Sequence, residues 1–177
     1  MLIKSMLENP IDIRYSGEDP DEKILYVFRQ SFLVNIPWLF FSIVLCFAPF
    51  LILPLVPNFI NPGFKFSSTL FWYLIVFGYG LQNFLNWFFN VYIISNKKIV
   101  DVDFQGILYK KISEAPLKSI EDVTSTVKGI VGVVFNIGNV YIQTAAENRE
   151  FEFDFLDNPS KVRDIISDLV AKKRGHN

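Results

Sequence analysis

The hydrophobic residues are continuous in the first half of the chain and alternate with polar residues in the second half. No charged residue occurs between Arg29 and Lys65, or between Lys65 and Lys97. About 20 apolar residues in helical conformation cross the hydrocarbon of a bilayer. We therefore predict two membrane-spanning helices, at about residues 32–56 and 68–89, joined as a hairpin by a link rich in Pro, Asn and Gly.

From Lys97 onward the pattern becomes that of half-buried β-strands. Val100, Val102 and Phe104 of IVDVDF (99–104) and the three phenylalanines of REFEFDF (149–155) are expected in the core. Their acidic neighbours, among them Asp101 and Asp103, are expected on exposed faces. Further strands are predicted at ILYKKI (107–112), SIEDVTSTV (119–127) and NVYIQTA (139–145), with turns at Gln105–Gly106 and within TAAENREF (144–151).

The chain closes with a predicted amphipathic helix. Asn158 is expected to be its N-cap, with Pro159 at the first helical position. A core-facing stripe follows the helical period at Val162, Ile165, Ile166, Leu169 and Val170. The predicted organisation is an N-terminal cytoplasmic segment (1–30), a transmembrane hairpin (31–94) and a cytoplasmic, mainly antiparallel β domain (95–177) with this helix across it.

Composition excludes several functional classes. The chain has 177 residues and a net charge of −1, so no global basic field favours nucleic acid as a partner. Cys46 and His176 are the single cysteine and the single histidine, which argues against a disulfide framework, a zinc site or a Cys/His dyad. No pattern places a nucleophile beside a base. We predict no enzymatic activity, no metal and no cofactor.

Lysine and arginine residues near the span ends predict the topology. They flank both outer ends of the hairpin, whereas the link carries only Lys65. We therefore expect a multi-pass protein of the inner membrane with both termini in the cytoplasm. Two alternatives, a buried helical pair in a soluble protein and a cleaved signal peptide, are disfavoured by the length and position of the charge-free runs.

Two sets of residues are candidate contact sites. Four lysines, namely Lys97, Lys98, Lys110 and Lys111, are candidates for contact with anionic lipid headgroups, or serve only as a solvated face that sets topology. A polar row in the second span, namely Gly78, Gln82, Asn83 and Asn86, is a candidate for packing against the first span or another subunit. For Asn86, a position at the wet membrane interface is an equal alternative.

The segment VKGIVGVVFNIGNVYIQT (127–144) contains three glycines, Gly129, Gly132 and Gly138. It lacks the spacing and the Gly-Lys-Ser/Thr ending of a phosphate-binding loop, and it lacks a dinucleotide fingerprint. We predict that Gly129 and Gly132 permit a tight turn or short helical loop. Gly138 is predicted to permit a positive φ where the chain re-enters the sheet.

Three segments carry a resemblance to a known family: DEKILYVFRQS (21–31), the stretch 92–144 with ISNKKIVD, PLKSIEDV and GIVGVVFNIGNVYI, and FLDNPSKVRDII (155–166). Their order resembles the bacterial pleckstrin-homology-like (PH-like) membrane proteins, in which pairs of transmembrane helices precede a PH-like domain. The resemblance implies a membrane-tethered β-sandwich or partly open barrel with a C-terminal helix, and no established enzymatic activity.

We therefore expect a membrane α-helical hairpin plus a mainly-β PH-like domain. Its expected role is non-enzymatic: it binds protein or lipid, or assembles with copies of itself, at the cytoplasmic membrane face. The alternative is a subunit of an oligomeric channel or transport assembly. Expected partners are the lipid bilayer, anionic headgroups, and a protein or a second copy of the chain.

Overall fold

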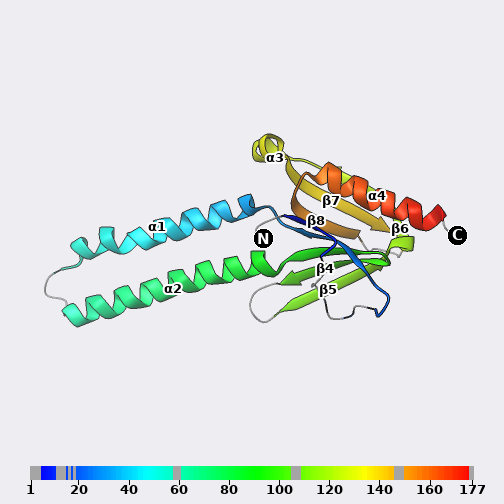
Figure 1. Cartoon of the computed structure of the whole chain (residues 1–177). Helices are drawn as coiled ribbons and strands as arrows, with labels where there is room; N and C mark the ends of the chain where they lie inside the picture. The colour runs from blue at the N-terminus through cyan, green and yellow to red at the C-terminus, as the bar shows by residue number, and fades with distance from the viewer. Residues whose placement is uncertain are drawn as a thin grey trace.

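The computed structural model describes residues 5–10, 15, 17, 19–57, 61–104, 109–145 and 150–175. A helical hairpin projects from one end of a module made of two small sheets and a helix (Figure 1). The predicted turns at 105–106 and 146–149, and His176, lie outside the described residues. We call the two sheets with their covering helix the β module.

Two antiparallel sheets form the β module. The five strands of sheet A lie in chain order, namely β1 (Met6–Glu8), β2 (Ile24–Arg29), β3 (Val91–Ser95), β4 (Lys98–Phe104) and β5 (Lys110–Pro116). After the short helix η3 (Leu117–Ser119), sheet B follows as β6 (Ile120–Thr126), β7 (Ile137–Thr144) and β8 (Glu150–Asp157). The predicted mainly-β architecture is confirmed.

The helical hairpin is an insertion between two neighbouring strands of sheet A. It runs through η1 (Phe32–Asn35), α1 (Ile36–Ile52), η2 (Leu53–Leu55) and α2 (Pro62–Phe89). β2 enters the hairpin and β3 leaves it, and the two strands pair, with Phe28 opposite Tyr92. The predicted division at residues 30 and 95 therefore differs from the structure, because β2 and β3 both belong to the β module. Pairing across so long an insertion leaves no local signal in the sequence.

By length and hydropathy, one segment of the described residues qualifies as a membrane span. This is Phe32–Leu55, with a mean hydropathy of 2.4. The second predicted span corresponds to α2, which is longer but carries Lys65 and the amides Gln82, Asn83 and Asn86. These residues lower its mean hydropathy. The hairpin therefore has two helices, and one segment of it meets the length and hydropathy of a membrane span.

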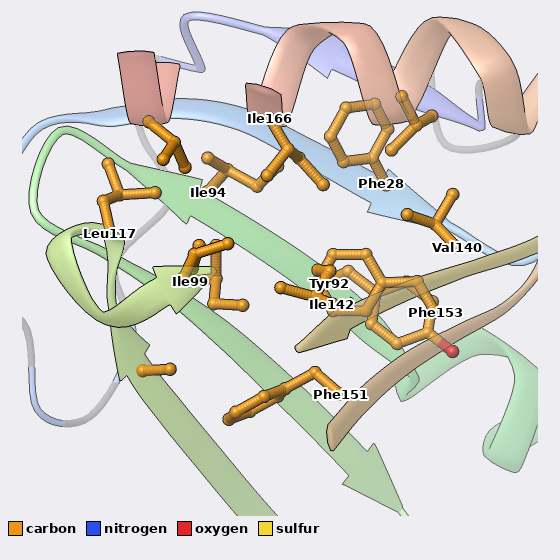
Figure 2. Close-up of a cluster of buried hydrophobic side chains, with 14 of the residues drawn as sticks. Phe28, Tyr92, Ile94, Ile99, Leu117, Val140, Ile142, Phe151, Phe153 and Ile166 are labelled. Carbon is orange, nitrogen blue, oxygen red and sulfur yellow. The ribbon is translucent and has the colours of Figure 1, made fainter. Parts of the chain in front are cut away.

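The main core lies between the two sheets and α4 (Pro159–Gly175), which covers sheet B (Figures 1 and 2). Phe28, Ile94 and Ile99 from sheet A meet Val140, Ile142 and Phe153 from sheet B. The predicted stripe of α4 faces this core: Val162, Ile166 and Val170 are buried, and Ile165 and Leu169 are partly buried against it. The rings of Tyr92 and Phe153 stack at 4.3 Å and join the sheets.

The alternation within β8 is interrupted, which corrects one prediction. Phe151 and Phe153 are buried as expected, but Phe155 is 49% exposed, and Leu156 takes the inward position instead. An extra residue in β8 causes this reversal. Leu156 pairs with Gly138 and Phe153 pairs with Val140, so Asp154 and Phe155 lie opposite the single residue Asn139, and Phe155 has a φ of 51°. An irregularity of one residue moves the following side chains to the opposite face.

Asn158 lies at the start of α4, as predicted, and its carbonyl accepts from the Val162 amide at 3.3 Å. The Asn158 side-chain oxygen accepts a hydrogen bond from Nδ2 of Asn136, which precedes β7. The start of α4 is thereby tied to the loop before β7.

The two ends of the β module differ in the elements that they hold. The root end is where α1 and α2 join the sheets, and it also holds the starts of β5, β7 and α4 (Figure 1). The distal end holds the β3–β4 turn and the end of α4, where Lys173 Nζ donates to the Asn96 carbonyl at 3.1 Å. With seven residues in β4, the ends are about 20 Å apart along that strand.

Candidate functional site

The structure separates the four candidate lysines into two pairs. Lys97 and Lys98 lie at the distal end, whereas Lys110 and Lys111 begin β5 at the root end, opposite Phe104 and Asp103 of β4. The two pairs therefore lie about 20 Å apart along β4, and contact of either pair with lipid stays a prediction.

Lys97 and Lys98 hold carboxylates at the distal end. Lys97 Nζ lies 3.6 Å from Asp19, and Lys98 Nζ lies 2.7 Å from Glu114 and 3.7 Å from Glu22. The Glu22 side chain is fully buried. These contacts fasten the segment before β2 to sheet A.

Burial of Glu22 is offset by hydrogen bonds. Desolvation would raise the pKa of Glu22, but donors from Ser95, the Tyr15 hydroxyl at 2.6 Å and the Asp19 amide at 3.0 Å stabilise the charged form. Lys98 adds attraction, and the resulting pKa of Glu22 lies below its ordinary value. The distal end therefore keeps a buried carboxylate charged.

At the root end, Lys110 lies among aromatic rings. Its Nζ is 5.5 Å from the centre of the Phe104 ring, and that ring is 5.2 Å from Phe89 at the end of α2. Arg29, at the end of β2, similarly lies 4.9 Å from the Phe88 ring. The cations of this end are thus next to the aromatic residues from which the hairpin emerges.

The contact between α1 and α2 uses a different face of α2 from the predicted one. Trp72 Nε1 donates to the Leu45 carbonyl at 2.9 Å, and the Tyr73 hydroxyl donates to the Cys46 carbonyl at 3.2 Å. Gly80 faces α1, since a Cβ there would lie 3.8 Å from Ser42 Oγ. The small residue at this contact is Gly80.

Gly78 and Gln82 of the predicted polar row lie away from α1. A Cβ added to Gly78 would meet nothing within 4 Å, and Gln82 is exposed. Asn83 Nδ2 donates to the Tyr79 carbonyl of its own helix at 2.8 Å, and Asn86 is partly buried. Positions 78 and 80 are two residues apart, and so point to nearly opposite sides of a helix. Gly78 and Gln82 therefore do not pack against the first span, and packing of the row against another subunit stays a prediction.

The glycine segment forms the short helix α3 (Gly129–Phe135) at the root end. Gly129 has a φ of 76° and Gly132 is buried in the helix, so the predicted short helical loop is confirmed. The predicted positive φ at Gly138 is wrong, and the left-handed residue is Asn136, with a φ of 54°. Gly138 is needed for close approach, because a Cβ there would lie 2.1 Å from the Thr126 carbonyl oxygen.

A cavity of about 540 Å³ lies between α3, the start of α1 and sheet B. Leu33, Val34 and Pro37 line it from the α1 side, and Val131 and Gly132 line it from α3. Its polar residues include Lys128, Asn139 and Tyr141. The described residues that line the cavity are mainly apolar.

Carboxylates gather beside this cavity. Asn139 Nδ2 donates to Glu152 at 2.9 Å and to Asp154 at 2.7 Å. Desolvation, followed by repulsion from Glu152, raises the pKa of Asp154 to about 6, while hydrogen bonds, first from Tyr141, lower the pKa of Glu152. Desolvation and then Asp103 raise the pKa of Asp101 to about 6.

The expectation that Asp101 occupies an exposed strand face is therefore wrong, because its side of β4 is partly covered. Among the described residues, no group of three or more His, Cys, Asp or Glu side chains has the geometry of a metal site. Sequence reasoning also missed the apolar side chains of α3. The signal available was the uninterrupted apolar run after Lys128, which fits neither strand alternation nor a core-facing stripe.

Comparison with protein families gives a match to the model described as "Bacterial PH domain" over residues 32–170. Comparison with curated proteins gives no match. Among solved structures, a protein of the DUF1696 family with a pleckstrin-homology domain, from Shewanella loihica PV-4, is similar at 15% identity and a TM-score of 0.35. That likeness covers 47% of this chain and 68% of the other chain.

Proposed function

The chain belongs to the bacterial PH domain family, and we propose that it is a non-enzymatic binding module anchored in the inner membrane by both helices of the hairpin. The β module then lies at the cytoplasmic face, where it binds protein or lipid. The observation that carries this proposal is the exposed apolar surface along both α1 and α2.

Many large apolar side chains are exposed on both helices. Phe50 and Leu51 on α1 are 69% and 73% exposed, and Phe71 and Phe77 on α2 are similarly exposed. Soluble monomers rarely expose apolar patches larger than a few hundred Å². With 28 residues, α2 is about 42 Å long, which exceeds the hydrocarbon thickness of about 30 Å. Lipid is the solvent that suits both helices.

The basic residues favour a cytoplasmic root end. Arg29, Lys110 and Lys111 lie at this end, whereas Lys65, near the tip of the hairpin, donates to the Val56 carbonyl at 3.1 Å. An excess of Lys and Arg on one side is typical of the cytoplasmic side. Both ends of the chain are then cytoplasmic. Lys110 and Lys111 are the two candidate lysines that can approach anionic headgroups in this orientation.

Reporter fusions test the anchor. A reporter that is active only in the cytoplasm is fused after Gly175, and one that is active only outside the inner membrane is inserted at Asn61, between the helices. We expect both fusions to be active. An inactive reporter at Asn61, with the protein recovered from the soluble fraction, would contradict the proposal.

A second candidate function is a subunit of an oligomeric membrane assembly. The observation that favours it is the polar outer face of α2, where Gln82 is exposed and Gly78 has open space. In hydrocarbon such a face gains from a partner helix. Mass measurement of the intact protein in nanodiscs tests this function: a monomer at working concentrations would exclude it, whereas disulfide trapping of a Gln82→Cys variant in a Cys46→Ala background would support it.

A further inference from the structure

We infer that α3 is a membrane contact separate from the hairpin, and that its apolar side chains enter the lipid layer at the root end. This inference rests on the proposed membrane anchor. It concerns a different element, and it predicts a fixed orientation of the β module against the leaflet.

The composition and exposure of α3 point to an apolar partner. All large side chains of the helix are apolar and between 56% and 85% exposed, namely Ile130, Val131, Val133, Val134 and Phe135. Gly132 is its single buried residue. A helix that packs its side chains on the β module would bury one apolar stripe. In α3 the apolar side chains are instead exposed all around the helix, except where it contacts the β module.

The local structure holds α3 in this position. A Cβ at Gly132 would lie 2.9 Å from the Ile137 carbonyl oxygen, so the glycine lets the backbone of α3 sit directly on the start of β7. After the helix, the left-handed Asn136 accepts a hydrogen bond at its carbonyl from the Asn158 amide at 2.9 Å. The outward-facing apolar side chains are therefore carried by a short segment that is fastened to sheet B and α4.

The position of α3 identifies lipid as the partner. Val131 and Gly132 face Leu33, Val34 and Pro37, at the start of the hairpin, across one cavity. Phe32 and Ile36, in the same first turns, are 50% and 51% exposed. The apolar surface of the hairpin thus continues across the cavity onto α3. If the start of α1 enters lipid, α3 lies beside it at the same depth relative to the membrane surface.

The charges agree with this placement. No charged residue lies within α3, and Lys128 immediately precedes it. Lysine can extend its ammonium group to the headgroup region while its stem stays in apolar surroundings. A short apolar helix preceded by a cation suits the boundary between headgroups and acyl chains.

Spin labels in lipid nanodiscs test the inference on the full chain. In a Cys46→Ala background, a nitroxide is attached at Val133→Cys in α3, at Leu51→Cys in α1, or at Gln143→Cys, an exposed position toward the distal end of β7. Collisions with oxygen report contact with lipid, and collisions with a nickel chelate report contact with water. All three positions are exposed, so labelling leaves the core intact.

We expect the labels at Val133 and Leu51 to collide several-fold more with oxygen than with nickel, and the label at Gln143 to show the reverse. A Val133 label that behaves like Gln143 while Leu51 reports lipid would overturn the role of α3 and leave the anchor standing. A Val133 label shielded from both reagents would place α3 against a protein or a second copy, and also overturn it. A Leu51 label in water would refute the anchor itself.

Discussion

The pKa values of carboxylates are shifted in opposite directions toward the two ends of the β module. At the distal end, a fully buried carboxylate, Glu22, stays charged because several donors and Lys98 surround it. Between the middle of the strands and the root end, Asp101 and Asp154 are only partly covered, yet burial and neighbouring carboxylates raise the pKa of both to about 6. Burial alone does not decide the charge of a carboxylate; the donors supplied with it do.

The lysines show the same contrast. Lys97 and Lys98 have carboxylate partners within 4 Å, whereas Lys110 lies over the Phe104 ring. The lysines of the distal end are thus paired with carboxylates of the same chain, which is typical of a surface exposed to water. The root end exposes apolar side chains and cations together, which is the composition of a membrane interface. Four experiments, each with a control variant, test this contrast, from the largest expected effect to the smallest.

Gly138→Ala should be the most damaging change at the root end. The added Cβ would lie 2.1 Å from the Thr126 carbonyl oxygen and 3.1 Å from Pro159 Cγ, so β6 and β7 cannot keep their register. We expect a loss of about 4 kcal/mol in the free energy of unfolding, or no folded protein. Thermal unfolding of the purified protein in detergent measures it.

Gly78→Ala is the matched control, because nothing lies within 4 Å of the added methyl group. In a helix interior, alanine should leave the melting temperature unchanged or raise it slightly. Equal destabilisation by the two substitutions would show that the close approach at Gly138 does not support the root end.

Glu22→Gln should destabilise the distal end by about 2 kcal/mol at neutral pH, because charged acceptors of hydrogen bonds are lost from a buried site. The folded-state pKa of Glu22 lies below its ordinary value of 4.5. Its contribution is therefore present above pH 4.5 and is lost as the pH falls through the folded-state pKa. Denaturation curves across acidic and neutral pH measure it.

Glu114→Gln removes the exposed partner of Lys98 and serves as the control, with an expected loss below about 1 kcal/mol. The distal ion pairs would be unimportant for stability if the variants at 22 and 114 had the same small effect. A Glu22→Gln effect that grew as the pH fell below 4.5 would contradict the assigned direction of the pKa shift.

Asp101→Asn should act with the opposite pH dependence. Its folded-state pKa is about 6, against an ordinary value of 3.8, so the folded protein binds more protons in this interval and loses stability as the pH rises through it. Asparagine removes the unfavourable charge and should stabilise by about 1 to 2 kcal/mol at neutral pH, after allowance for solvent screening. Chemical denaturation at several pH values measures the gain.

The gain from Asp101→Asn should disappear below pH 3.8, where the carboxyl is protonated in both states. Glu121→Gln, on an exposed position of β6, provides the comparison and should change little. A destabilising Asp101→Asn substitution at neutral pH would mean that the carboxylate makes a favourable contact that outweighs its desolvation.

Lys110→Gln combined with Lys111→Gln should weaken the preference of the reconstituted protein for anionic lipid. Each lysine near the surface contributes up to about 1 kcal/mol. Association of spin-labelled phosphatidylglycerol, relative to phosphatidylcholine, measures this preference. Lys97→Gln combined with Lys98→Gln is the matched pair at the distal end and should leave the preference unchanged. The reverse result would place the distal end, not the root end, at the membrane.

Local patterns predicted most of the secondary structure. Strands lie where β-branched and aromatic residues alternate with acids, as in 99–104, and α4 follows the stripe from Val162 to Val170. These predictions succeed because the period of burial is a property of neighbouring residues. The prediction of Phe155 in the core failed because β8 has one extra residue opposite Asn139 of β7, which shifts the register. The alternation of apolar and acidic residues in β8 does not show where this extra residue lies, because it is defined by the pairing with β7.

The candidate sites were less predictable than the fold. Charge counts identified Lys97, Lys98, Lys110 and Lys111 as one group, but the direction of β4 places the two pairs at opposite ends. Spacing by four correctly grouped Gly78 and Gln82 on one side of α2, but could not tell which side faces α1. A periodic pattern defines a face, whereas its neighbour depends on the rotation of the helix in the packed structure.

The sequence by itself determined that a helical hairpin with long charge-free runs adjoins an alternating β segment and an amphipathic terminal helix, because helix and strand periods are written in adjacent residues. Only the tertiary structure decided that β2 and β3 pair across the hairpin, that Glu22 and Asp101 have opposite pKa shifts, and that α3 lies beside the start of α1. These features depend on residues far apart in the chain, whose distance and shielding from water are set only when the chain has packed.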